Sequence, residues 1–244
     1  MRTWAGFALS AALTLQVVML PGLDGTGRLS VPFLGALRTG GLDARVLALP
    51  SVGAQDYRTL AEVVRPQLPA QPFVLVAESF AGPLAVELAA GLLPGLRGLV
   101  LCTTFARRPV PLPPAAAMAL APAWPMPPLP LLARLLLGQW RTGEHTSMLR
   151  DALAQVPATT LRQRAAATLR VDVRALLPQI GVPTLCLQAC HDRLLWPPSV
   201  AELQTLLPDA RHVALDGPHL LLQACAEPAA AVVAGWVRAL PATG

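Results

Sequence analysis

The chain has 244 residues, a length that favours one sizeable α/β domain with an insertion over two independent domains. It is 54% hydrophobic and only 14% charged, so it can bury a large core without disulfides or metal ions. The formal net charge is +5, and all of the basic residues counted in it are arginines, since the chain has no lysine. The arginines are scattered along the chain and form no basic tract, which argues against nucleic acid as a partner.

The N-terminal run of uncharged residues, 4–20, has two interpretations. An early positive charge at Arg2, an apolar stretch and small residues around Ser10 resemble an export signal. The second half of the run, residues 15–20, contains β-branched residues and leads directly into a glycine-rich turn, as a core strand does. We therefore expect a cytoplasmic protein with a short N-terminal extension, with export as the alternative. Stable membrane insertion is not expected, because part of a short run is needed for the strand.

Short apolar segments then alternate with helical patterns. The expected strands cover residues 15–20, 45–49, 73–77 and 96–102. The expected helices cover residues 29–38, 57–68 and 83–92, with breaks at Gly40-Gly41 and Pro69. This alternation predicts a parallel sheet that is covered by helices on both faces.

The third of these strands leads directly to Ser79, which lies between the small residues Ala77 and Ala81. A serine on so tight a strand-to-helix turn has the residue sizes of a nucleophile elbow, in which the hydroxyl is exposed at the edge of the sheet. Taken alone, the stretch also fits a plain turn with an exposed serine. We interpret Ser79 as a candidate nucleophile.

The alternation stops between residues 105 and 181. This segment is proline-rich from Pro109 to Pro130 and then predicts helices at 131–137, 144–155, 158–170 and 172–177, with no convincing strand. A block of helices between two strands is typical of an inserted cap rather than a linker. Its arginines are expected on a solvated face: Arg162, Arg164, Arg170 and Arg174.

After the insertion the alternation resumes. Strands are expected at 183–188 and 210–215, and helices at 198–206 and 221–240. The chain is therefore expected to form one core from residues 1–104 and 182–244, with residues 105–181 as a helical cap. The sheet of this core has about six strands.

A serine hydroxyl needs a general base, and the base needs a partner that holds its tautomer. His219 follows the last expected strand in Asp-Gly-Pro-His, and Asp192 follows the strand before it. Loops at the carboxyl ends of parallel strands meet at one edge of a sheet, so both side chains are expected near Ser79. Taken alone, His219 could be an ordinary surface histidine, and Asp192 could be a residue that caps a helix.

Acyl transfer also needs two donors for the oxyanion that develops. The N–H of Phe80, directly after the serine, is one candidate. The N–H of Leu23, in the glycine-rich loop after the first strand, is the other. That loop could instead bind phosphate, but it fits neither the P-loop nor the dinucleotide pattern, and Asp24 would repel a polyanion.

These motifs give the chain a family resemblance. The segments are Leu-Pro-Gly-Leu-Asp-Gly-Thr-Gly at 20–27, Ala-Glu-Ser-Phe-Ala-Gly at 77–82, Gly-Val-Pro-Thr-Leu at 181–185 and Gly-Pro-His at 217–219. The chain resembles the α/β-hydrolase superfamily from Leu15 to Leu240, with the chain order Ser79, Asp192, His219. The first segment is similar to the loop of a bacterial and plastid esterase-like or acyltransferase-like subgroup. Alanines flank Ser79 where glycines are commonest, and no catalytic group is missing.

The resemblance implies a serine hydrolase of the carboxylesterase kind, with an α/β-hydrolase fold and a small-molecule ester or thioester as substrate. Leu, Met and Trp side chains in the cap indicate a hydrophobic substrate group, and packing within the cap is their alternative role. The candidates for substrate contacts are Gly22, Asp24, Trp124 and Trp140. No metal or organic cofactor is implied, and the four cysteines match neither a zinc site nor a redox pair. The alternatives are an acyltransferase, a C–C hydrolase, a cofactor-free lyase, or a non-catalytic ligand-binding protein with the same fold.

Overall fold

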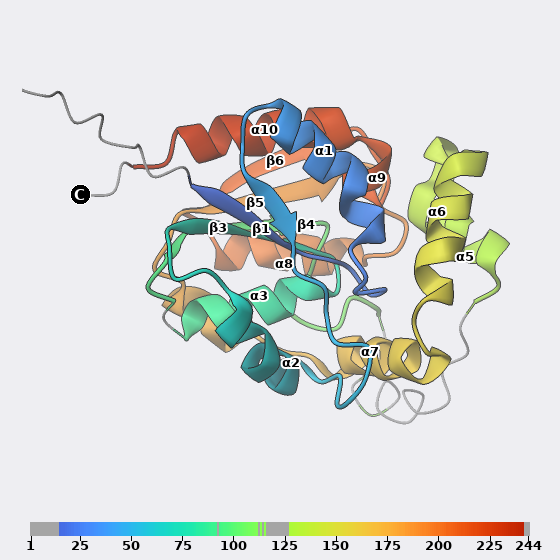
Figure 1. Cartoon of the computed structure of the whole chain (residues 1–244). Coiled ribbons are helices and arrows are strands. Elements are labelled where there is room, and N and C mark those ends of the chain that lie inside the picture. The colour runs from blue at the N-terminus through green and yellow to red at the C-terminus, as the bar shows by residue number, and fades with distance from the viewer. Residues whose placement is uncertain (1–14, 92, 112, 114, 116–126, 242–244) are drawn as a thin grey trace, which may run out of the picture.

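The computed structural model describes residues 15–241, apart from residues 92, 112, 114 and 116–126. The described residues contain one parallel sheet of six strands in the order β2-β1-β3-β4-β5-β6. The strands are β1 Gln16–Leu20, β2 Ala44–Val46, β3 Phe73–Glu78, β4 Leu96–Cys102, β5 Thr184–Ala189 and β6 Arg211–Leu215. This is the predicted α/β architecture (Figure 1).

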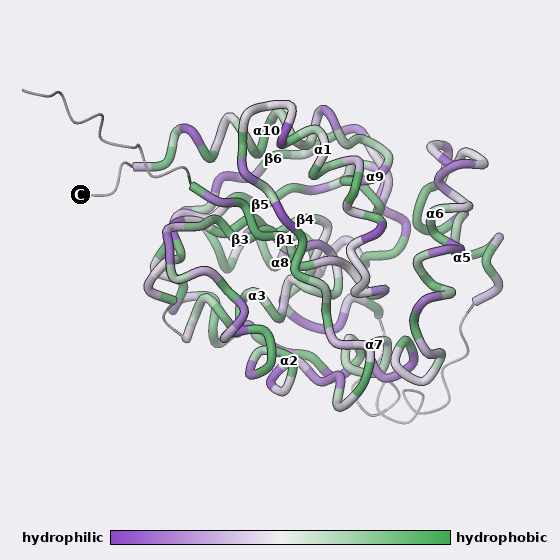
Figure 2. Tube along the Cα trace, viewed as in Figure 1, coloured by the Kyte–Doolittle hydropathy of each residue, from purple (hydrophilic) through white to green (hydrophobic). Residues whose placement is uncertain are grey.

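Helices cover both faces of the sheet. On one face lie α1 Val31–Thr39, α9 Leu221–Ala224 and α10 Ala226–Arg238; on the other lie α2 Tyr57–Val64, α3 Ala81–Ala90 and α8 Pro197–Leu206 (Figure 1). Alternate residues of β3 supply the two hydrophobic cores, since Val74 and Val76 face the α1/α10 layer while Leu75 faces the α2/α3 layer. The central strands are hydrophobic along their length because both of their faces are buried (Figure 2).

Strand register brings the carboxyl ends of the strands together. Glu78 at the end of β3 pairs with Cys102 of β4, Cys102 pairs with Leu187 of β5, and Ala189 at the end of β5 pairs with Leu215 of β6. The loops that leave β1, β3, β5 and β6 therefore share one edge of the sheet. Residues far apart in the chain meet there.

The α-helices described between β4 and β5 are α5 Leu129–Leu137, α6 Gly143–Ala154 and α7 Ala158–Arg170. Helices α5 and α6 form a small core of their own, with Leu137 and Leu149 packing against Leu29 and Leu220 from the sheet domain. Helix α7 instead lies close to α2 (Figure 1). Thr160 on α7 donates a 2.7 Å hydrogen bond to the carbonyl oxygen of Ser51.

Three predicted elements depart clearly from the observed ones. The strand expected at 45–49 ends at Val46, because the Leu49 N–H leaves the sheet and donates to Gly25 O at 2.8 Å. The helix expected at 221–240 is broken at Cys225, where φ is −129° and ψ is 45°, into α9 and α10. The helix expected at 172–177 is the 3₁₀ helix η5, Arg174–Gln179, which contains Pro178.

The solvated-face prediction is wrong for Arg164, which is fully buried. Its helix packs on the sheet domain, so the arginine side chain points inward and finds polar partners there. No helix among the described residues has the length and apolar character that a membrane span needs.

Candidate active site

Ser79 occupies a strained turn between β3 and α3. Its φ is 51°, in the left-handed region that a residue with a side chain seldom adopts. Hydrogen bonds hold the strained residue on both sides: its N–H donates to Cys102 O at 2.9 Å, and its carbonyl oxygen accepts from Gly82 N at 3.0 Å and from Thr104 Oγ1 at 2.6 Å. The turn thus presents the hydroxyl at the edge of the sheet.

The close approach of α3 to the loop after β4 depends on Gly82. A Cβ atom at residue 82 would lie 1.9 Å from Oγ1 of Thr104 and 2.6 Å from its Cβ. Sequence reasoning noted the alanines on either side of Ser79 but had no signal for this contact. Thr104 is distant in sequence, and only the pairing of β3 with β4 brings it here.

Three side chains form a continuous hydrogen-bonded row. Ser79 Oγ lies 2.8 Å from Nε2 of His219, and Nδ1 of His219 lies 2.7 Å from Oδ2 of Asp192. The His219 side chain is 2% exposed and that of Asp192 is 9% exposed, so the row is largely shielded from water. With the proton of the neutral imidazole on Nδ1, Nε2 can accept the serine proton. The predicted site residues Ser79, Asp192 and His219 therefore lie in contact.

Asp192 is ionised at neutral pH. Burial alone would raise the pKa of its carboxyl group, but the charge of His219 and the hydrogen bonds from His219, Leu195 and Leu194 bring the pKa below its ordinary value. An ionised carboxylate stabilises the imidazolium that forms when His219 takes a proton.

The loop after β1 lies directly beside the serine. Residues 22–25 form a β-turn closed by the Gly25 N–H, which donates to Gly22 O at 3.0 Å. A Cβ atom on Gly22 would lie 4.0 Å from Cβ of Ser79. Within the described part of the chain, the N–H groups of Leu23 and Phe80 have no protein acceptor, so both remain available to a ligand oxygen.

Asp24 is buried, and its carboxylate is turned to its own loop. Oδ2 accepts from the Thr26 N–H at 2.9 Å and from the Thr26 hydroxyl at 2.5 Å. The residue still lines the cavity at Ser79, as does Gly22. Both predicted loop residues are thus beside the serine.

A cavity of about 220 Å³ opens at Ser79 and His219. Its wall is mainly apolar and comes both from loops at the edge of the sheet and from helices α5, α6 and α7: Leu29, Phe105, Leu132, Leu136, Leu149 and Leu169. Trp140 is not among the described residues that line it; its ring instead lies tilted against that of His191, with centroids 5.2 Å apart and an interplanar angle of 45°. The predicted contact Trp124 lies outside the described residues.

Glu78, directly before the serine, also lines the cavity, and sequence reasoning gave it no role. Its Oε2 accepts from Gln223 Nε2 at 3.0 Å, while Oε1 is buried without a partner among the described residues. Burial raises the pKa of Glu78 to about 7, against the hydrogen bond from Gln223 and the charge of His219. The Glu78 carboxyl therefore exchanges a proton near neutral pH.

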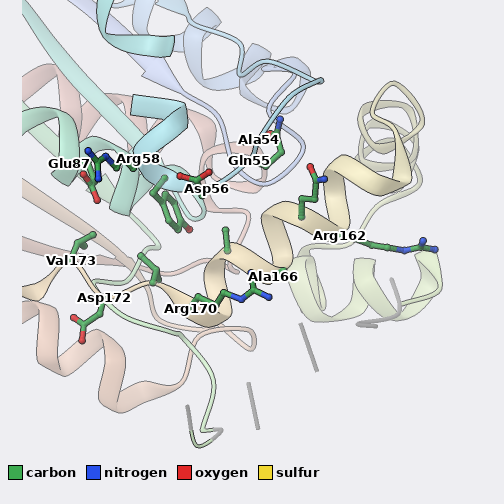
Figure 3. A pocket seen from close by; sticks show the side chains of 14 residues that line it. Ala54, Gln55, Asp56, Arg58, Glu87, Arg162, Ala166, Arg170, Asp172 and Val173 are labelled. Carbon is green, nitrogen blue, oxygen red and sulfur yellow. The ribbon is translucent and has the colours of Figure 1, made fainter. Parts of the chain in front are cut away.

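A second, larger cavity of about 570 Å³ lies between α2 and α7 (Figure 3). Charged side chains of both signs surround it: Asp56, Arg58, Glu87, Arg162, Arg170 and Asp172. None of its described lining residues belongs to the serine–histidine–aspartate row. Ser79 and His219 line the smaller cavity, so we take that cavity as the candidate active site. Among the described residues, no group of three or more His, Cys, Asp and Glu side chains could hold a metal ion.

Comparison with known proteins agrees with the predicted α/β-hydrolase fold. The family model described as the alpha/beta hydrolase family matches residues 17–234. The enol-lactonase from Burkholderia xenovorans LB400 is similar in structure, with a TM-score of 0.77, 20% identity and coverage of 92% of each chain. A thermophilic esterase from Thermogutta terrifontis has a TM-score of 0.75 and 21% identity, with 92% of this chain and 89% of the esterase covered. No curated protein matches the sequence at a significant level.

Proposed function

The chain belongs to the alpha/beta hydrolase family, and from this premise we propose that it is a serine hydrolase that cleaves a carboxylic ester or thioester with a hydrophobic group. The observation that carries the proposal is the row in which Ser79 Oγ, His219 and Asp192 are joined at 2.8 and 2.7 Å. The strained φ of 51° at Ser79 supports it further, because strain of this kind is retained where the chemistry uses it.

In the proposed mechanism Ser79 Oγ attacks the substrate carbonyl carbon while Nε2 of His219 takes the hydroxyl proton. The carbonyl oxygen becomes an oxyanion, which accepts hydrogen bonds from the N–H groups of Leu23 and Phe80. The intermediate collapses as His219 returns the proton to the leaving alkoxide or thiolate, and Ser79 keeps the acyl group. Water, activated by the same histidine, then hydrolyses the acyl-serine.

The apolar wall of the cavity supports a hydrophobic acyl or alcohol group. The cavity has a volume of about 220 Å³. We therefore expect medium-length chains to be preferred over acetyl groups. The helices between residues 105 and 181 supply part of this wall, and we propose that they are the cap of the enzyme.

We also propose a cytoplasmic location. The four cysteines are free thiols, and Cys102 and Cys186 are buried in the core as small apolar residues. A reducing compartment suits such thiols. Mass analysis of the mature N-terminus tests the alternative of export, and a cleaved leader would overturn the cytoplasmic proposal.

The experiment that tests the function uses a fluorophosphonate probe and a series of p-nitrophenyl esters. We expect the probe to modify Ser79, as located by peptide mass spectrometry, and Ser79→Ala to abolish both labelling and ester turnover. Ser51→Ala, at an exposed serine, is the matched control and should keep both. Full turnover by a folded Ser79→Ala protein would refute the serine mechanism and favour a non-catalytic or different role.

A further inference from the structure

The guanidinium of Arg164 is fully buried and makes four hydrogen bonds. Its Nη1 donates to the carbonyl oxygens of Leu23 and Asp24 at 2.8 and 2.7 Å. Its Nη2 donates to Pro50 O at 2.9 Å, and its Nε donates to Gln55 Oε1 at 2.8 Å. All four acceptors are neutral oxygens, so the inserted helix α7 contributes a desolvated cation to the loop after β1.

A buried cation of this kind is not explained by stability. Removing a charge from water costs several kcal/mol, and well-packed apolar residues often stabilise a fold at least as well. The carboxylate of Asp24 is hydrogen-bonded to Thr26 and counters by its charge the lowering of the Arg164 pKa by burial, but no carboxylate among the described residues lies within ion-pair distance of Arg164. We therefore ask what the guanidinium does to the loop of residues 22–25, which it contacts.

The contacts of Arg164 immobilise the turn that carries the Leu23 N–H. The peptide unit with this N–H is held by Gly22 O, which accepts from Gly25 N. The next two peptide units are held by Arg164 through the carbonyl oxygens of Leu23 and Asp24. Every peptide unit of the turn is thus anchored, and the direction of the Leu23 N–H is set before a substrate binds.

Arg164 also reaches the residue that carries the other candidate donor. Its guanidinium carbon lies 5.9 Å from the ring centroid of Phe80, whose ring stacks on that of Tyr57 at 5.0 Å. One side chain of the insertion therefore contacts both residues whose N–H groups face the carbonyl oxygen in the proposed mechanism.

The close approach of Arg164 to the turn requires a glycine at position 25. Its φ is +69°, and a Cβ atom there would lie 2.2 Å from Nη1 of Arg164. Any larger residue would displace the guanidinium or the turn. The sequence pattern of the loop and the buried arginine of α7 thus form one structural unit, although they are about 140 residues apart in the chain.

We propose that Arg164 is a positioning residue of the oxyanion hole, holding the turn of residues 22–25 so that the Leu23 N–H meets the developing oxyanion. The proposal rests on the serine hydrolase function proposed above. Its consequence is that the inserted helices act on the rate of the chemical step and not only on substrate binding. Interactions that matter only in the transition state change kcat rather than KM.

The test compares Arg164→Lys and Arg164→Met with the wild-type protein. We expect kcat to fall by on the order of 10²-fold in the methionine variant, the range for loss of one oxyanion donor, and by less in the lysine variant, which keeps the charge. KM should stay within about threefold. Arg107→Lys is the matched control, because Arg107 pairs with Glu202 at 2.7 Å away from the serine, and its kcat should be unchanged.

Two inhibitors distinguish a positioning role of Arg164 from a general structural role. A trifluoromethyl ketone forms an oxyanion on Ser79, whereas the matching methyl ketone binds without forming it to a comparable extent. We expect the Arg164 variants to weaken the first inhibitor by the same factor as kcat/KM and the second by no more than about twofold. Equal weakening of both inhibitors, or an unchanged kcat in a folded variant, overturns the proposal.

A double-mutant cycle keeps the proposal testable if Arg164→Met does not fold. Gly25→Ala should lower kcat in both backgrounds, because its φ of +69° strains any side chain, but by a smaller factor with Arg164→Lys, because the guanidinium that the methyl group would meet is absent. Equal losses in both backgrounds overturn the proposal. The Ser79→Ala variant distinguishes failure of the proposed function from failure of the positioning proposal. If ester turnover survives Ser79→Ala, the serine hydrolase function is refuted. If Ser79→Ala abolishes turnover but the Arg164 variants keep it, only the positioning role of Arg164 is refuted.

Discussion

The carboxylate of Asp192 divides its two oxygens between His219 and its own loop. Oδ2 lies 2.7 Å from Nδ1 of His219, while Oδ1 accepts the N–H groups of Leu194 and Leu195 at 2.8 and 2.9 Å. The two backbone hydrogen bonds hold the carboxylate in one orientation. The hydrogen bond to Oδ2 then sets the orientation of the His219 imidazole. The histidine is therefore oriented by the start of the loop after β5, without a further side chain.

Asp192→Asn should lower kcat by on the order of 10³- to 10⁴-fold with little loss of stability. The amide oxygen can still accept from the loop, but the NH₂ group would then face Nδ1 and place the imidazole proton on Nε2, where it blocks attack. Ester turnover and thermal unfolding measure the two effects. Asp216→Asn is the matched control, since Asp216 is exposed and pairs with His191 at 3.0 Å, and its activity should stay within twofold. A similar kcat for both variants would refute the orienting role.

Gly82→Ala should destabilise the protein by at least about 2 kcal/mol, because the new methyl group would overlap Thr104 and neither the turn nor β4 can move freely. Urea unfolding monitored by circular dichroism measures the change. Gly35→Ala, in the interior of α1 with no atom within 4 Å of the added Cβ, should instead stabilise by about 0.5–1 kcal/mol. Equal changes in the free energy of unfolding for both variants would show that the contact with Thr104 does not affect stability.

Glu78→Gln should change how stability depends on pH. Burial raises the pKa of Glu78 from its ordinary value of 4.5 to about 7, so the folded protein binds this proton more tightly than the unfolded chain. Stability from this group is present below pH 4.5 and is lost as the pH rises through 7. The variant should therefore gain about 2–3 kcal/mol relative to the wild-type protein between pH 5 and pH 8.

Unfolding in urea at several pH values measures this gain. Glu87→Gln, at a partly exposed residue of α3, provides the comparison and should give a curve parallel to that of the wild-type protein. A parallel curve for Glu78→Gln as well would mean that the buried carboxyl does not titrate in this range.

Leu149→Ala should shift substrate preference towards longer acyl chains. Leu149 is 2% exposed and lines the cavity, so its truncation enlarges the space at Ser79 while costing about 2–4 kcal/mol of stability. Relative kcat/KM values along a p-nitrophenyl ester series measure the shift. Leu60→Ala, which is equally buried but lies in the α2 layer, should lose similar stability without altering the chain-length profile. An identical profile for both variants would argue that acyl chains do not occupy this cavity.

The strands and helices were largely predictable because their signals are local. Apolar segments such as residues 73–77 and 96–102 are short and bounded by turns, and the structure has β3 and β4 there. The limits of elements were less predictable: β2 ends early because the Leu49 N–H bonds to Gly25, and Cys225 divides the last helix. The early end of β2 is caused by a contact with a segment distant in sequence.

By itself, the sequence determined the order of strands and helices and the positions of Ser79, Asp192 and His219 at strand ends, because strand ends and tight turns depend on neighbouring residues. Only the tertiary structure decided the distances between them, the contact of Gly82 with Thr104, and the burial of Arg164. An arginine on a helix has the same local signal whether it faces water or the protein. What covers it depends on how the inserted helices pack against the sheet domain, and that packing decides which loop its guanidinium holds.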